Sequence, residues 1–277
     1  MSLLTPGSIN ALLREHDVRP SRALGQNFLA DGNTARRIVR LAGLEPGDHV
    51  LEIGPGIGSL TLALRERGVH VRALELDRHL VPVLRSVVGD DPMVDIVQGD
   101  ALEIDLGALL ADAPSWRAVS NLPYNVATPV VIRLLEHAPM VDRMLVMVQR
   151  EVGERMAAAV DSEAYGAMSV KVAYYATAKV VGTVPPTVFM PAPKVESALV
   201  ALDRRAVPPV DVPSVDRMFV LVRAGFGQRR KTLRQALKAL LGDATVGTLE
   251  AAGIDPRARA ETLGLEEWAA LARVDAA

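Results

Sequence analysis

Short apolar runs alternate with helically spaced apolar positions in the middle of the chain. Five runs have the length and the flanking turn residues of strands, at 49–54, 70–76, 94–97, 116–121 and 144–149. Apolar residues three and four apart predict helices over 59–67, 79–88 and 129–137. Ser59 or Thr61 is expected to cap the first helix, and Gly68 to end it. This alternation favours an open, mostly parallel sheet with helices on both faces.

The pattern changes toward the end of the chain. Residues 171–184 and 197–202 are expected to form late strands, including an antiparallel hairpin at the sheet edge. Three prolines within 203–214 indicate a linker, and the apolar positions beyond it keep helical spacing only. We therefore expect an α/β domain with an N-terminal arm over residues 1–206 and a small all-helical domain over 207–277.

Composition excludes several kinds of site. The chain has 277 residues, of which 49% are apolar and 23% charged, a balance typical of globular proteins. It has no cysteine, which excludes disulfides, a thiolate nucleophile and cysteine-ligated zinc. The five histidines lack metal-ligand spacing, so we expect no metal site. No signal peptide or apolar stretch of about 18 residues is visible, and a cytoplasmic protein without a membrane span is expected.

The basic residues are unevenly distributed along the chain, which the net charge does not show. The formal net charge is -2, which by itself argues against a nucleic-acid partner. Between Arg217 and Lys238, however, there are seven basic residues and no acidic one. A solvated helix face is the ordinary interpretation of such a run. RNA binding is the alternative, and its candidate residues are Arg223, Arg229, Arg230, Lys231, Arg234 and Lys238.

A glycine-rich turn follows the first strand. Gly54, Gly56 and Gly58 alternate with other residues and would let a ligand approach the backbone closely. Glu75 ends the second strand and could accept hydrogen bonds from both hydroxyls of a ribose, while Asp100 follows the third strand. A dinucleotide site is the main alternative, but its third glycine would stand at position 59, which is serine. A purely structural turn also remains open; nucleoside binding of the S-adenosylmethionine type is favoured.

The fourth strand ends in Ser-Asn-Leu-Pro-Tyr-Asn at residues 120–125. The side-chain oxygen of Asn121 and the backbone carbonyl of Leu122 could accept the two N–H groups of an exocyclic amine. Pro123 would fix the turn that directs this carbonyl, and Tyr124 could stack on a flipped base. An ordinary Asn-x-Pro turn is the alternative, and it would be preferred without the glycine loop and the two acids. Together these features indicate methyl transfer to an adenine amine.

With these residues assembled, the chain resembles the ribosomal RNA adenine dimethyltransferase family, and most closely its bacterial small-subunit members. The resemblance covers nearly the whole sequence. The remaining motifs that carry it are LGQNFL at 24–29, FMPAPKVES at 189–197, QRRKTLR at 228–234, IDP at 254–256 and RAETL at 259–263. Each motif alone is weak, whereas their order and spacing are specific.

The resemblance implies a Rossmann-like class I methyltransferase fold, with a mostly parallel seven-stranded sheet and a helical C-terminal domain that binds RNA. It also implies S-adenosylmethionine as methyl donor and S-adenosylhomocysteine as product. Tyr124 and Phe189 would sandwich the target adenine, although Phe28 and Phe189 could equally be core aromatics. The residues that would bind the cofactor are Gln26, Asn27, Leu29, Gly54, Gly56, Glu75, Asp100 and Asn121.

The implied substrate is 16S rRNA within the immature 30S subunit. There the family dimethylates N6 of two adjacent adenines near the 3′ end, as part of small-subunit biogenesis. No dimerisation segment is visible, and we expect a monomer. Three alternatives are a 23S rRNA enzyme of the erythromycin-resistance type, a DNA adenine methyltransferase and a non-catalytic assembly factor. The Asn-Leu-Pro-Tyr-Asn and Gln-Arg-Arg-Lys-Thr segments favour the small-subunit enzyme over the 23S type, and the short helical C-terminus disfavours the DNA enzyme.

Overall fold

The computed structural model describes the chain except for residues 1–2, 22–23, 229 and 277. The chain forms two compact units. The first consists of residues 1–153 and 179–204, and the second of residues 154–178 and 205–277. The segment 154–178 thus packs with the C-terminal helices, whereas the sequence suggested a single division at residue 206.

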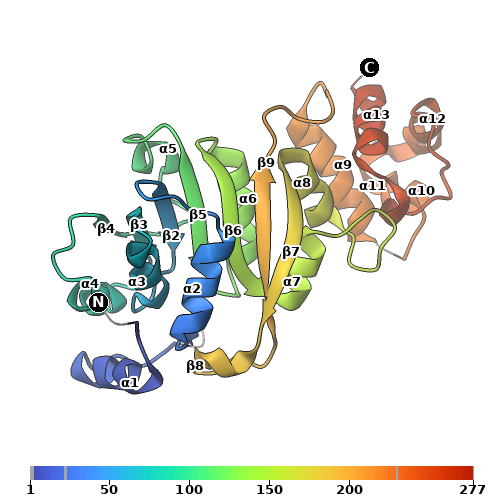
Figure 1. Ribbon diagram of the computed structural model, residues 1–277. Coiled ribbons are helices and arrows are strands. Elements are labelled where there is room, and N and C mark those ends of the chain that lie inside the picture. Colours follow the sequence, from blue (N-terminus) through green and yellow to red (C-terminus); the bar gives the residue numbers. More distant parts are fainter. Residues whose placement is uncertain (1–2, 22–23, 229, 277) are drawn as a thin grey trace. The chain divides into compact units, whose positions relative to one another are not determined.

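A seven-stranded sheet organises the first unit, with the strand order β4-β3-β2-β5-β6-β9-β7 (Figure 1). Neighbouring strands from β4 to β6 are parallel, and β6 pairs antiparallel with β9. The expected mostly parallel sheet is therefore confirmed. The strands are β2 (His49–Ile53), β3 (His70–Glu75), β4 (Val94–Gln98), β5 (Trp116–Asn121), β6 (Val141–Gln149), β7 (Ala176–Val184) and β9 (Ser197–Arg204).

Helices cover both faces of this sheet. In Figure 1, α2 and α3 lie in front of the strands and α6 lies behind them. The helices of this unit are α1 (Pro6–Glu15), α2 (Gly32–Leu41), α3 (Ser59–Glu66), α4 (Leu80–Val88), α5 (Leu106–Leu109), α6 (Ala127–His137) and the start of α7 (Arg150–Met156). The α3 cap differs from the expectation: Gly58 is the N-cap, and no side chain caps the helix. Thr61 instead donates its hydroxyl to Glu52, so neither predicted residue caps α3.

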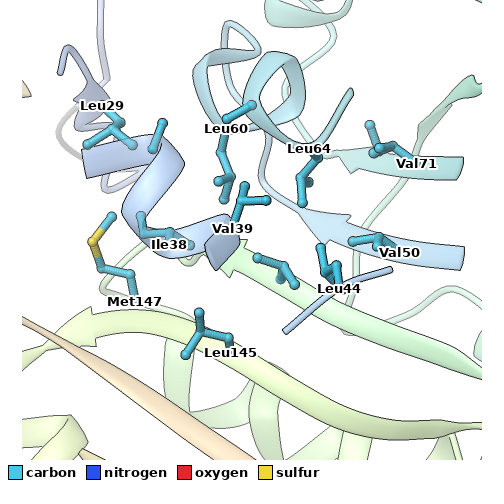
Figure 2. Close-up of a cluster of buried hydrophobic side chains, with 14 of the residues drawn as sticks. Leu29, Ile38, Val39, Leu44, Val50, Leu60, Leu64, Val71, Leu145 and Met147 are labelled. Carbon is cyan, nitrogen blue, oxygen red and sulfur yellow. The ribbon is translucent and has the colours of Figure 1, made fainter. Parts of the chain in front are cut away.

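The core beneath α2 and α3 includes side chains of β2, β3, β5 and β6. Figure 2 shows Ile38 and Val39 of α2 and Leu60 and Leu64 of α3 against side chains of the sheet. Burying each such side chain stabilises the fold by about 1.5–3 kcal/mol relative to leaving it in water. The loops after β2, β3 and β5 therefore start from strands that are held in place by this core.

The N-terminal arm is fastened to the same unit at two places. Ile9 and Leu13 of α1 pack with Phe28, Ile57 and Leu80 in a separate apolar cluster. Farther along, β1 (Phe28–Leu29) pairs antiparallel with β8 (Phe189–Met190), which follows the short 3-10 helix Pro186–Val188. The arm therefore runs beside the loops that follow β2 and β3.

The second unit is built from short helices around one apolar core. Trp268 is fully buried, and a Cβ on Gly225 would lie 2.6 Å from its ring, so glycine is needed where α9 meets α13. The elements are α8 (Ala167–Tyr175), α9 (Val215–Gly227), α10 (Leu233–Ala236), α11 (Lys238–Leu241), α12 (Thr245–Ala251), α13 (Leu265–Asp275) and two 3-10 turns at Gly242–Ala244 and Ala260–Thr262.

One element was wrongly predicted. Residues 171–175 were expected to begin a strand, but they end helix α8, and β7 starts only at Ala176. The run Val170, Val172 and Tyr174 alternates like a strand, yet all three side chains are buried in a helix. A helix that is apolar on most sides shows no clear period, and the β-branched residues favoured the other interpretation.

Candidate active site

The first unit contains a cavity at the carboxyl ends of its parallel strands. Its walls come from the loops after β2, β3, β4 and β5 and from the N-terminal motif 24–29. Open parallel sheets bind ligands at this edge. Of the residues predicted from sequence, those in the cavity wall are Gln26, Asn27, Leu29, Gly54, Gly56, Glu75, Asp100, Asn121, Leu122, Pro123 and Tyr124.

The glycine loop is shaped by close backbone approaches. Gly54 and Gly56 have φ of 67° and 60°, in the left-handed region. A Cβ on Gly54 would lie 3.1 Å from the Pro123 ring, and one on Gly56 would lie 3.0 Å from the Phe28 ring. Both glycines therefore make room for protein groups as well as for a ligand. The glycine loop therefore packs against both the 121–124 turn and the N-terminal motif.

Glu75 lies where β3 ends and is only 5% exposed. Its two carboxylate oxygens accept hydrogen bonds from the backbone N–H groups of Gly56 and Asp77, each at 2.9 Å. Burial raises the pKa of Glu75, and these backbone donors oppose that shift. Each oxygen retains a lone pair, so the carboxylate can accept a further hydrogen bond from a ribose hydroxyl.

A second buried acid, Glu52, was not predicted from the sequence. It is 1% exposed, lines the cavity from β2 and accepts the Thr61 hydroxyl at 2.6 Å. Burial raises the pKa of Glu52 to about 8, with a smaller contribution from the charge of Glu75. The side chain is therefore mostly neutral at pH 7. An acid inside the apolar run that precedes the glycine loop was the signal that could have revealed it.

The loops after β3 and β4 supply two further lining side chains. Asp100 accepts the backbone N–H of Leu102 at 2.8 Å, which stabilises the turn that holds its carboxylate at the wall. Leu76 is 51% exposed although it lines the cavity directly after Glu75. An exposed apolar side chain next to Glu75, the candidate acceptor for ribose hydroxyls, offers a surface on which a flat ring could pack. Leu76 was not singled out from the sequence.

The N-terminal motif closes one side of the cavity. Gln26 donates its side-chain amide to Asp77 at 2.8 Å and accepts the backbone N–H of Ser21 at 2.7 Å. Both ends of this side chain thus hold protein groups, and Gln26 fastens the motif to the loop after β3. Leu29 turns its side chain into the apolar core, as Figure 2 shows. Asp77, which receives Gln26, was also missed by sequence reasoning.

The turn after β5 places Asn121 in a defined orientation. Its amide nitrogen donates to the backbone carbonyl of Asn27 at 3.2 Å. Because that carbonyl only accepts, the amide must direct its nitrogen there and its Oδ1 atom elsewhere. Leu122 donates its N–H to Met147 at 3.1 Å, and Pro123 accepts the N–H of Val126 at 3.1 Å. The backbone that carries the proposed acceptors is therefore anchored on both sides.

Tyr124 lies half-buried in the cavity wall. Its hydroxyl forms a hydrogen bond of 2.7 Å with the hydroxyl of Ser197, the first residue of β9. Burial raises the pKa of Tyr124, so the phenol is neutral at physiological pH.

Phe189 is not brought to the cavity. It is 5% exposed, belongs to the apolar core and pairs with Leu29 across β1 and β8. The packing of this ring matches the core-aromatic alternative, and the sandwich of the target adenine between Tyr124 and Phe189 stays a prediction. Its neighbour Leu29 does line the cavity, so the chain beside Phe189 reaches the site although its ring does not.

The basic run lies in the second unit. Arg223, Arg230, Lys231, Arg234 and Lys238 are exposed there, and Arg229 lies outside the described residues. Arg217, the first member of the run, forms an ion pair with Asp275 at 2.6 Å. In the described part of the chain, no three His, Asp or Glu side chains gather as metal ligands, and no helix is long and apolar enough to cross a membrane.

The sheet order, the glycine loop after β2 and the acid at the end of β3 define a class I methyltransferase. Residues 19–276 match the family described as ribosomal RNA adenine dimethylase. The chain belongs to this family.

Curated relatives agree over the full length. The ribosomal RNA small subunit methyltransferase A of Thermobifida fusca is 47% identical, with 98% of this chain and 95% of the relative covered. The protein of the same name from Leifsonia xyli is 46% identical, with 98% of each chain covered.

Two solved structures share the fold. A dimethyladenosine transferase from Plasmodium falciparum superposes with a TM-score of 0.72 at 24% identity, over 88% of this chain and 95% of that one. The 23S rRNA methyltransferase ErmE gives a TM-score of 0.66 at 28% identity, over 90% of this chain and all of ErmE.

Proposed function

We propose that this enzyme transfers methyl groups from S-adenosylmethionine to N6 of adenine in the RNA of the small ribosomal subunit. The observation that carries the chemistry is the Asn121 amide, whose nitrogen is held by Asn27 so that its oxygen is available at the cavity. The family and the full-length relatives named small subunit methyltransferase support the substrate.

The residues of the cavity suit a nucleoside with a charged amino-acid tail. When bound, S-adenosylmethionine supplies an electrophilic methyl group on its sulfonium. Glu75 would accept the ribose hydroxyls, Leu76 would pack against the base, and Asp100 would lie near its edge. Gly54 and Gly56 admit close approach because they lack a Cβ. Asn27 and Asn121 would hold the other end, while Gln26 acts through Asp77 by closing the wall.

The proposed chemistry depends on positioning. The lone pair of the adenine N6 amine is delocalised into the ring, which makes the amine a poor nucleophile. Asn121 Oδ1 and the Leu122 carbonyl would accept its two N–H groups and favour a pyramidal nitrogen, with Pro123 directing the carbonyl. Tyr124 would stack on the flipped base. A strong base is not required, because the methylated amine is cationic and loses a proton readily.

The target assignment rests on comparison with the nearest alternative. Over almost the whole chain, identity is 47% to the small-subunit methyltransferase of Thermobifida fusca and 46% to that of Leifsonia xyli, against 28% to the 23S rRNA methyltransferase ErmE. We therefore propose two adjacent adenines near the 3′ end of 16S rRNA as the target, in an immature 30S subunit. A cytoplasmic, monomeric enzyme completes the proposal.

The second unit is proposed to bind the ribosomal subunit. Its exposed basic side chains, Arg223, Arg230, Lys231, Arg234 and Lys238, would contact phosphates. Arg229 belongs to the same sequence motif. The predicted RNA-binding domain over 207–277 would then include residues 154–178 as structural support, since these pack with it.

A substrate panel tests this proposal. The protein would be incubated with labelled S-adenosylmethionine and with 30S subunits lacking the modification, 50S subunits or duplex DNA. Label confined to the 30S subunits supports the assignment. Label in 23S rRNA or DNA would instead favour one of those enzymes. Binding of 30S subunits without transfer to any substrate would indicate a non-catalytic assembly factor.

A further inference from the structure

The ring of Tyr124 is held at both of its ends. At the backbone end, the turn is anchored by the Leu122–Met147 and Val126–Pro123 hydrogen bonds. At the phenol end, the hydroxyl bonds to Ser197 at 2.7 Å. Ser197 is fully buried and stands in register with Gln149 across β6 and β9, so the sheet fixes its position. The hydrogen bond at the phenol end and the anchored turn at the backbone end together restrict how far the ring can tilt.

We infer that Ser197 is a positioning residue that holds the Tyr124 ring against the target base, and that it is needed mainly for the second methyl transfer. This inference rests on the proposed function. Ser197 lies on β9, at the end of the FMPAPKVES motif, and it does not itself line the cavity. It would act on the substrate only through Tyr124.

The two transfers differ in how the base is held. Unmodified adenine offers two N–H groups, which match the two acceptors at Asn121 and Leu122. N6-methyladenine has one N–H, so one acceptor loses its partner and the amine is less firmly oriented. The first methyl group leaves stacking on Tyr124 unchanged. Stacking therefore contributes relatively more to the orientation of the base in the second transfer than in the first. A ring that is free to tilt therefore costs the second transfer more than the first.

The test measures both rate constants under single turnover, at saturating S-adenosylmethionine, on unmodified 30S subunits. In the Ser197→Ala variant, the second transfer should slow by about five- to tenfold, the scale of one lost hydrogen bond. The first should change by less than about twofold. Monomethyladenosine should accumulate, while the Kd for S-adenosylmethionine stays at the parent value.

Tyr124→Phe removes the same hydrogen bond from the other side without disturbing β9. It should give the same accumulation, and the double variant should be no worse than either single one, since both remove one interaction. Ser169→Ala is the matched control, because Ser169 is also a buried serine and its hydroxyl donates to the Arg155 carbonyl within the second unit. It should leave the product ratio at the parent value.

An unchanged product ratio in Ser197→Ala or Tyr124→Phe would overturn the inference, as would an equal shift in Ser169→Ala. Additive effects in the double variant would also overturn it, because the two residues would then act separately. If the parent protein transferred no methyl group at all, the proposed function would fail together with this inference. If the parent protein dimethylated fully and the variants gave the same product ratio as the parent, only this inference would fail and the proposed function would stand.

Discussion

The amide nitrogen of Asn121 lies 3.2 Å from the backbone carbonyl of Asn27, which joins the end of β5 to the N-terminal motif. The hydrogen bond links residues 94 positions apart in sequence. It orients the acceptor oxygen of Asn121 through backbone that any residue at position 27 would supply. The side chains of the two asparagines can therefore have different duties.

Replacement of each asparagine should separate these duties. Asn121→Ala removes an acceptor for the amine and should lower kcat by about 10²-fold or more, the usual scale for a lost oriented group. Asn27→Ala keeps the carbonyl but loses the side-chain bond to Gly25, so it should mainly raise the Kd for S-adenosylmethionine. Calorimetry and single-turnover rates measure the two effects. A large loss of kcat in both variants would contradict the division.

A glycine comparison tests the shape of the cavity. Gly56→Ala places a Cβ 3.0 Å from the Phe28 ring, at φ 60°. Gly43 has almost the same φ, 62°, but its added Cβ would meet no atom within 4 Å. Both alanine variants should lose about 1 kcal/mol or more of stability from the backbone alone. Only Gly56→Ala should also weaken cofactor binding, by displacing the N-terminal motif. Equal cofactor affinity in the two variants would show that Phe28 can move aside without affecting the cofactor site.

The stability of the free protein should fall as the pH rises toward 8, because of Glu52. Its folded pKa is about 8, against an ordinary value of 4.5, so between these values the folded state holds a proton that the unfolded state has lost. Glu52 thus contributes a progressive loss of stability in this window, on the order of 1 kcal/mol per pH unit. The Glu52→Gln substitution removes this pH-dependent loss of stability, because the glutamine side chain does not ionise.

Urea midpoints of the parent protein and Glu52→Gln, measured from pH 5.5 to pH 8.5, check this prediction. The difference between them should grow in favour of the glutamine variant as pH rises. Glu66→Gln is a control, because Glu66 is a surface acid of α3 paired with Arg36 and its pKa is lowered by that guanidinium. Parallel pH profiles for the parent and Glu52→Gln would show that Glu52 is ionised in the folded protein.

The basic run makes a prediction about salt. Arg234→Glu combined with Lys238→Glu should weaken 30S binding and reduce the slope of log K against log salt by roughly one for each phosphate that is no longer neutralised. Arg257→Glu is the control, since Arg257 is exposed in the same unit but paired with Asp255. A filter-binding series in increasing KCl measures both. Equal weakening in the double variant and the control would indicate a general charge effect instead of specific phosphate binding.

Sequence reasoning reached most of the fold because the sheet strands are short apolar runs bounded by turn residues. Trp116–Asn121 was predicted with both bounds correct, and β2 to β4 to within one residue. The failure at 171–175 has a local cause, since a helix buried on most sides loses its period. The grouping of 154–178 with the C-terminal helices depends on tertiary packing, which no local pattern encodes.

The sequence predicted cavity-lining residues where a motif marks a strand end, as at Gly54, Glu75 and Asn121. No role was predicted for the residues that hold the predicted site residues in place. Asp77 and Ser197 form hydrogen bonds with Gln26 and Tyr124 over separations of 51 and 73 positions. Such pairings follow from the sheet order and cannot be derived from spacing along the chain. The burial of Phe189 in the core could not be derived from its place in the FMPAPKVES motif, because it depends on the pairing of β8 with β1.

The most direct test of the central claim is nucleoside analysis of 16S rRNA after incubation of unmodified 30S subunits with the protein and S-adenosylmethionine. We expect N6,N6-dimethyladenosine with the parent protein, and none with Asn121→Ala in the same time. A methylated nucleoside other than an N6-methylated adenosine, or no methylation despite measured cofactor binding, would contradict the claim.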